Sequence, residues 1–123
     1  YRAAGGEFVV LDDGGALRGA HAVLPFADRP RVCTFRRLYL DPRLRGAGAG
    51  SRLMLWAVEW ALAHGLAQVE FWSDSRFARA HRFFVNTGFV RTGEVRDMTD
   101  GADPYREYFF TGDLAAIAAA SGL

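Results

Sequence analysis

A glycine-dense segment between a strand-like run and a helix-like run is the feature that most constrains how this chain folds. Residues 45–50 read Arg-Gly-Ala-Gly-Ala-Gly, after a strand-like run at 35–40 and before a helix-like run that starts at Ser51. Glycine has no Cβ, so the backbone N–H groups of such a turn can approach a ligand closely. The free N–H groups and the dipole of the following helix favour an anion at the same place. The segment therefore predicts a phosphate-binding turn between a strand and a helix.

The composition is that of one globular domain spanning residues 1–123. Half of the 123 residues are apolar and 14% are aromatic, and the formal net charge is +1. This charge gives no general field that would attract nucleic acid or an anionic membrane. No membrane span or signal peptide is visible, so we expect a soluble, cytoplasmic protein with neither nucleic acid nor membrane as a partner.

The single cysteine and the absence of lysine exclude several kinds of binding site. Cys33 is the single cysteine, which excludes an intrachain disulfide and a cysteine-based metal cluster and suits a reducing compartment. All fifteen basic residues are arginine. The absence of lysine excludes the Walker type of phosphate loop, which requires Gly-Lys-Ser/Thr, and no residue pattern indicates a metal site.

Alternating and helix-periodic apolar residues predict the order β-β-β-α-β-α-β-β. The Asp-Asp-Gly-Gly sequence at 12–15 predicts the turn of an antiparallel hairpin, and Gly65 and Gly88 are expected helix stops. This order indicates an α+β domain with a mixed, mostly antiparallel sheet flanked by helices. The expected strands are 7–11, 16–26, 32–40, 67–72, 89–97 and 106–111; the expected helices are 51–64 and one capped within 73–75 that ends near 87, and an apolar tail follows at 114–123.

Two motifs in this order resemble those of the GNAT superfamily of acyl-CoA-dependent N-acetyltransferases. The family's Arg/Gln-x-x-Gly-x-Gly/Ala turn matches residues 45–50, and its aromatic pair followed by Gly-Phe matches Phe83, Phe84, Gly88 and Phe89. The match covers about residues 7–110. It implies a three-layer α/β arrangement in which acetyl-CoA lies between two central strands that splay apart.

The resemblance also implies which residues hold the acetyl-CoA co-substrate. The backbone of the strand at 38–40 would pair with the pantetheine arm, and the glycine turn with the first helical residues would hold the pyrophosphate. No metal is implied. The expected cofactor-binding residues are Leu38, Tyr39, Leu40, Arg45, Gly46, Ala47, Gly48, Ala49, Gly50, Ser51, Arg52 and Phe84.

One position departs from the family pattern at a place that matters for catalysis. Where the family often has a tyrosine that protonates the leaving thiolate, this chain has Phe84, which has no proton to donate. The remaining catalytic candidates are Tyr108 as an acid and Glu70 or Asp74 as a base, with Asp97, Tyr39 and Tyr105 as further nearby groups. A thiolate departing without a general acid also remains open.

The second departure is at the amino terminus. The family usually begins with a strand and two helices that form part of the acceptor wall, and the match here starts at what would be the second strand. We therefore expect an N-terminally incomplete domain, or an open acceptor site that a partner subunit completes, as in a homodimer.

The leading hypothesis is an N-acetyltransferase in which a primary amine of unknown identity attacks acetyl-CoA directly. Cys33 lies early in its strand, away from the glycine turn, which favours direct transfer over a covalent enzyme intermediate. A non-catalytic acyl-CoA-binding or regulatory domain of the same fold is the alternative. A dinucleotide-binding fragment fits poorly, since Ser51 stands where its third glycine is needed.

Overall fold

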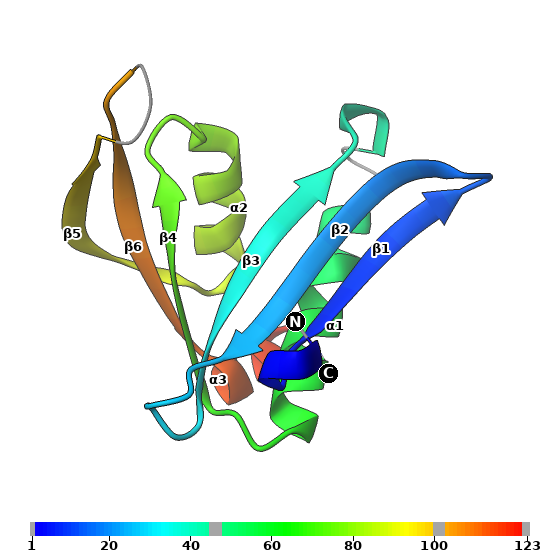
Figure 1. Cartoon of the computed structure of the whole chain (residues 1–123), viewed down its shortest axis with the longest axis horizontal. Coiled ribbons are helices and arrows are strands. Elements are labelled where there is room, and N and C mark those ends of the chain that lie inside the picture. Colours follow the sequence, from blue (N-terminus) through cyan, green and yellow to red (C-terminus); the bar gives the residue numbers. More distant parts are fainter. Residues whose placement is uncertain (1, 45–47, 100–102, 122–123) are drawn as a thin grey trace.

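The computed structural model describes residues 2–44, 48–99 and 103–121, which form one six-stranded sheet with helices packed against it (Figure 1). The strand order across the sheet is β1-β2-β3-β4-β6-β5. All neighbouring pairs are antiparallel except β3 and β4, which run parallel. The expected order of elements and the mixed, mostly antiparallel sheet are confirmed. The strands are β1 Glu7–Asp13, β2 Ala16–Pro25, β3 Val32–Leu40, β4 Gln68–Asp74, β5 Val90–Met98 and β6 Tyr105–Asp113.

The hairpin between β1 and β2 forms at the predicted turn. Gly14 and Gly15 have φ of 62° and 92°, a conformation that residues with a Cβ rarely adopt. The N–H of Gly15 also donates to Oδ1 of Asp12 at 2.9 Å. The turn residues therefore set the register of the first two strands.

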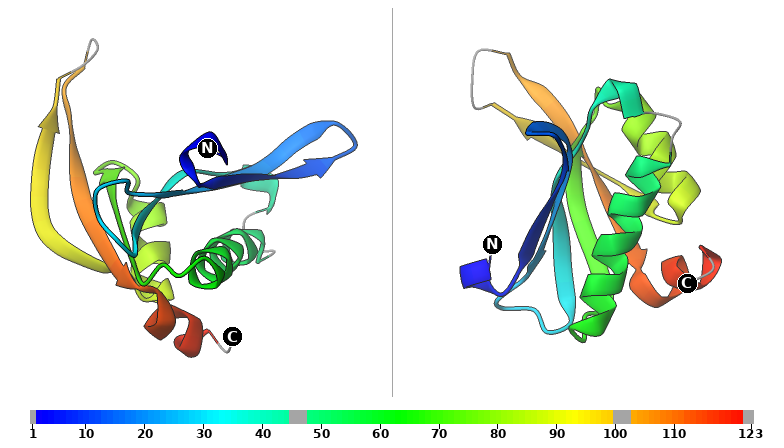
Figure 2. Two further views of the ribbon diagram at one scale, coloured as in Figure 1. Left: turned by 60° about the horizontal axis from the view of Figure 1, so that its bottom comes forward. Right: turned by 90° about the vertical axis from the view of Figure 1, so that its right-hand side faces the viewer.

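The helices are α1 Ala49–Ala63, α2 Ala78–Thr87 and α3 Leu114–Ala120, and all three lie on the same side of the sheet (Figure 2, right). Both predicted glycine stops are confirmed, because Gly65 and Gly88 have φ of 77° and 118°. The N–H of Leu66 closes the end of α1 on the carbonyl of Ala61 at 2.9 Å. The apolar tail after the last strand begins as α3, whose Asp113 accepts a hydrogen bond from the N–H of Ala116.

The start of α2 differs from the expectation. The capping residue is Phe77, which makes no side-chain cap, and the helix begins at Ala78. Asp74 is instead the last residue of β4. Its Oδ1 accepts a hydrogen bond from the backbone N–H of Arg76 at 2.9 Å. Asp74 therefore shapes the β4–α2 turn from a position four residues before the helix starts.

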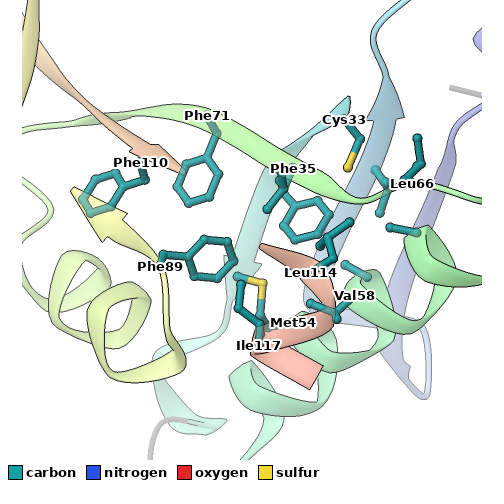
Figure 3. Packing of buried hydrophobic residues seen from close by; sticks show 14 of the residues in the cluster. Cys33, Phe35, Met54, Val58, Leu66, Phe71, Phe89, Phe110, Leu114 and Ile117 are labelled. Atoms are coloured by element: carbon teal, nitrogen blue, oxygen red, sulfur yellow. The ribbon is translucent and has the colours of Figure 1, made fainter. Parts of the chain in front are cut away.

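One apolar core lies between the sheet and the helices (Figure 3). Phe71 of β4 stacks on Phe110 of β6, and the ring edges of Phe84 and Phe89 pack against Phe71 at 5.0 and 5.3 Å between ring centroids. Burial of these rings holds α2 on the β4–β6 pair. Within the described residues no helix is both long and apolar enough to cross a membrane.

Candidate functional site

The central parallel strands separate soon after they meet. In the described residues β3 and β4 pair only at Val32 with Gln68 and at Cys33 with Val69, and the two strands then diverge (Figure 1). This leaves the later part of β3 without a strand partner on its β4 side. The predicted splay between the two central strands is therefore present in the fold.

A cavity of about 530 Å³ lies at the divergence. Its lining residues come from β2, β3, β4, β6, α1 and α2. Three of them, Phe35, Met54 and Phe71, also belong to the apolar core drawn in Figure 3. This volume falls in the range of small-molecule binding sites. The lining residues are His21, Phe35, Arg36, Arg37, Leu38, Met54, Phe71, Trp72, Ser73, Asp74, Phe77, Ala80, Phe84, Tyr105 and Glu107.

The N-terminus of α1 follows the glycine segment. Gly48 is the N-cap residue with φ of 80°, and no side-chain cap is present among the residues described there. A Cβ on Gly50 would lie 3.6 Å from Cδ2 of Leu40, an ordinary contact. Arg45, Gly46 and Ala47 fall outside the described residues. The described part of the predicted turn thus presents a helix start without a side-chain cap, as an anion site needs.

The segment between β3 and the glycine turn is held by a buried carboxylate. Asp41 accepts hydrogen bonds from the guanidinium of Arg18 at 2.8 Å and from the backbone N–H of Arg43 at 2.9 Å. Hydrogen bonds from Arg43 and Arg18 hold the pKa of Asp41 well below its usual range. The Arg43 guanidinium is therefore engaged in fixing the approach to the turn.

Only some of the predicted cofactor-binding residues outside the turn line the cavity. Leu38 and Phe84 line the cavity, and Phe84 is only 6% exposed. Tyr39 is 45% exposed and is not among the lining residues. Ser51 and Arg52 are exposed on the first turn of α1, where the N–H of Arg52 donates to the carbonyl of Gly48 at 3.0 Å.

Two carboxylates face each other across β4 and β6 at one end of the cavity. Asp74 pairs directly with Glu107, which the sequence analysis missed because only the strand register brings the two together. Arg76 binds Asp74 at 2.6 Å and Arg96 binds Glu107 at 2.6 Å. These arginines relieve the repulsion of two like charges on paired strands.

Each of these arginines also lies over an aromatic ring of the cavity wall. The Arg76 guanidinium carbon is 5.0 Å from the ring centroid of Tyr105, and that of Arg96 is 4.4 Å from Trp72. The hydrogen bonds from Arg76 lower the pKa of Asp74. A carboxylate with a lowered pKa is a weaker proton acceptor, so Asp74 is better suited to fixing the rim than to removing a proton.

The other two catalytic candidates are not among the residues that line this cavity. Glu70 forms an ion pair with Arg29 of the β2–β3 loop. Tyr108 pairs with Ser73 and faces α2, with its ring 5.7 Å from that of His81 and 3.5 Å from the guanidinium carbon of Arg91. The structure therefore brings Asp74 to the cavity without Glu70 or Tyr108, and brings Tyr105 there instead.

His21 of β2 is a further cavity residue that sequence reasoning did not select. It is 1% exposed, and its Nδ1 lies 3.2 Å from the carbonyl oxygen of Arg36. Burial lowers its pKa to about 4. A strand histidine among apolar neighbours gives no sequence signal that separates a core residue from a ligand-binding one.

As for metals, the described part of the chain holds no group of three or more His, Cys, Asp or Glu side chains that could bind an ion.

Comparisons with known proteins agree with this architecture. An uncharacterized N-acetyltransferase of Archaeoglobus fulgidus is 33% identical over 64 residues, which are 52% of this chain and 44% of that protein. The match thus spans less than half the length of that relative.

Solved structures show the same fold at low sequence identity. An IAA acetyltransferase from Bacillus cereus ATCC 14579 superposes with a TM-score of 0.71 at 18% identity, covering 88% of this chain and 77% of that one. A ribosomal-protein-alanine N-acetyltransferase from Brucella melitensis gives 0.74 at 17% identity, covering 91% and 71%. Residues 1–89 match the model of the Acetyltransferase (GNAT) family. The chain therefore belongs to the GNAT family of acetyltransferases, and its family and fold support acyl transfer as its chemistry.

Proposed function

We propose that this chain is an N-acetyltransferase domain that moves an acetyl group from acetyl-CoA to a primary amine. The observation that carries the proposal is the splay of β3 from β4 after Cys33, which opens a cavity of about 530 Å³. Beyond Cys33 the edge of β3 that faces β4 has no partner strand among the described residues, so an extended amide-bearing arm can bind there as an added strand would. The N-terminus of α1 after Gly48 offers free N–H donors for the phosphates.

The reaction we propose is a direct attack. The deprotonated amine forms a bond to the thioester carbonyl carbon, the carbon–sulfur bond breaks, and the CoA thiolate leaves and takes up a proton. The amine loses its extra proton to solvent or to a group at the rim. The cavity contributes by holding donor and acceptor side by side, which can supply about 7–11 kcal/mol of the barrier reduction when the geometry is right.

Cys33 supports direct transfer over a covalent enzyme intermediate. Its side chain is fully buried in the paired part of β3, and burial raises the pKa of the thiol to about 12. Such a thiol is almost entirely protonated at neutral pH and is a poor nucleophile. We expect Cys33→Ala to keep kcat within about twofold, because the cavity does not use the thiol. A loss of more than about 100-fold in a folded variant would instead indicate a covalent route.

The position of the phenols makes a second prediction about the leaving group. Tyr105 lines the cavity beside Arg76, whereas Tyr108 faces α2. If the phenol of Tyr105 protonates the thiolate, we expect Tyr105→Phe to lower kcat by about tenfold. This loss is smaller than the rate factor of about 100 or more that a fully effective general acid provides. Tyr108→Phe is the matched control and should stay within about threefold. Steady-state kinetics of the two variants check this, and a larger loss in Tyr108→Phe would restore Tyr108 as the candidate acid.

A specific observation also favours a second function, a non-catalytic acyl-CoA-binding domain. Phe84 is buried against Phe71 and Phe110 at the place where the family often has a tyrosine, and it gives the cavity no proton donor. The carboxylates Asp74 and Glu107 are both neutralised by arginines. The domain would then bind the donor without transferring its acyl group.

Thiol release from acetyl-CoA separates the two functions. The purified chain is incubated with acetyl-CoA and, one at a time, spermidine, kanamycin, a peptide with a free alanine N-terminus and a peptide with one lysine. We expect acceptor-dependent release of CoA with at least one amine. Calorimetric binding of CoA without turnover on any amine would favour the binding domain, and no binding of CoA would contradict both proposals. Because the chain has no lysine, acetyl groups on added amines cannot be confused with acetylation of its own side chains.

A further inference from the structure

His21 has one ring nitrogen whose partner is known and one that has none in the described structure. Nδ1 lies 3.2 Å from the carbonyl oxygen of Arg36. A carbonyl oxygen only accepts, so Nδ1 must carry the proton, and the imidazole is the Nδ1–H tautomer. Nε2 then bears a lone pair, and among the described buried side chains it is the atom without a hydrogen-bond partner.

This ring also lies where two strands are out of regular register. The β2–β3 pairing shifts between Ala20 and Ala22, so His21 stands opposite the irregular part of β3. There Arg37 has φ of 56°, an unusual value for a residue with a Cβ. The hydrogen bond from His21 to Arg36 is therefore one of the contacts that hold the bulge where β3 turns its later residues toward the cavity.

The ring is part of the cavity wall and is not merely packed in the core. His21, Arg36 and Arg37 all line the cavity, together with Phe35, which meets the imidazole edge to face at 5.3 Å. A buried lone pair without a partner costs about as much free energy as a lost hydrogen bond. Nε2 itself is closed off from solvent, so this cost is recovered when a side chain of the cavity wall moves and a donor of the ligand reaches the atom.

We propose that His21 binds the ligand of this cavity through Nε2, which accepts a hydrogen bond from an N–H group of that ligand. The inference rests on the proposed function, in which two kinds of N–H donor enter the cavity. One is an amide of the pantetheine arm of CoA and the other is the acceptor amine. Because the imidazole is neutral throughout the physiological pH range, Nε2 offers this lone pair at every working pH.

Two substitutions separate the nitrogens of the ring. In His21→Asn the side-chain NH₂ occupies the position of Nδ1, so the bond to Arg36 can be kept while the acceptor at Nε2 is lost. In His21→Gln the side-chain oxygen reaches the position of Nε2, so the acceptor is kept and the bond to Arg36 is lost. A structural role alone predicts that Gln is the more harmful change for every property, whereas a ligand contact predicts that Asn is the more harmful change for binding.

The experiment measures CoA affinity by calorimetry, the KM of the best amine from the panel above, and thermal stability without ligand. We expect His21→Asn to raise one of the two constants about tenfold, and His21→Gln to stay within about threefold of the wild type in that constant while melting at a lower temperature. A change in the Kd of CoA assigns the bond to the pantetheine arm. A change confined to the KM of the amine assigns it to the acceptor.

Nuclear magnetic resonance keeps the test independent of folding of the variants. In the ¹⁵N-labelled wild-type chain, the Nε2 resonance of His21 should move when CoA, or CoA with the amine, is added. If CoA binds but the resonance stays in place, and His21→Asn changes neither constant, the inference fails while the proposed function stands. If the wild-type chain binds no CoA, both fail.

Discussion

Replacement of Gly50 by aspartate is expected to weaken CoA binding by at least about 100-fold while the domain stays folded. Gly50 is the second residue of α1, where an acidic side chain is favourable for the helix itself. The same carboxylate would face the phosphates that we place at this helix start. Two charges about 4 Å apart repel by about 1 kcal/mol in water and about 4 kcal/mol near a protein surface, and about 3 kcal/mol corresponds to the expected change in Kd.

Gly50→Ala is the matched control for this substitution. A Cβ at position 50 meets Leu40 at 3.6 Å and Phe83 at 3.9 Å, which are ordinary contacts, so alanine adds bulk without charge. Gly48 is less suitable, because its φ of 80° strains any side chain. Calorimetry with CoA should show strong loss for aspartate and little for alanine at the same thermal stability. An unchanged Kd in Gly50→Asp would remove the helix start from the binding site.

The local features of the chain were predictable because each depends on a few neighbouring residues. The Asp-Gly turn at 12–15, the glycine stops at Gly65 and Gly88 and the run of the third strand each follow from backbone preferences that act within a few positions. The expected cap of α2 within residues 73–75 was wrong, because a side chain outside the helix competes for the capping group. Asp74 is a good cap in isolation, but its side chain is used by Arg76 at the end of β4.

Which side chains point into the cavity was less predictable, because this depends on the register between strands that are far apart in sequence. Tyr105 and Tyr108 are three residues apart and therefore point to opposite faces of β6, and only the pairing of β6 with β4 decides which one meets the cavity. The opposition of Asp74 and Glu107 has the same origin. The place of His21 depends in addition on the irregular register between β2 and β3.

The buried histidine gives the second large expected effect, a loss of stability in mild acid. Burial lowers the pKa of His21 from 6.5 to about 4, so between these values the unfolded chain binds a proton that the folded chain does not. The contribution of His21 to the free energy of unfolding should therefore be constant above pH 6.5. It should fall as the pH drops from 6.5 toward 4. The full loss is about 3 kcal/mol, at 1.36 kcal/mol for each pH unit between the two pKa values.

Urea unfolding from pH 7 to pH 4 measures this slope, and His21→Phe is the control because it fills the site without a titrating group. His81, whose pKa burial also lowers, contributes in the same direction, so the variant should keep a shallower slope. The lowered pKa values of Asp41 and Asp74 act below this window, because their stabilisation is lost only as the pH falls below about 3.8. Equal slopes in the wild type and His21→Phe would mean that the imidazole takes up its proton in the folded chain. Its Nε2 would then be a donor at acidic pH, and the cavity would be open to water at its base.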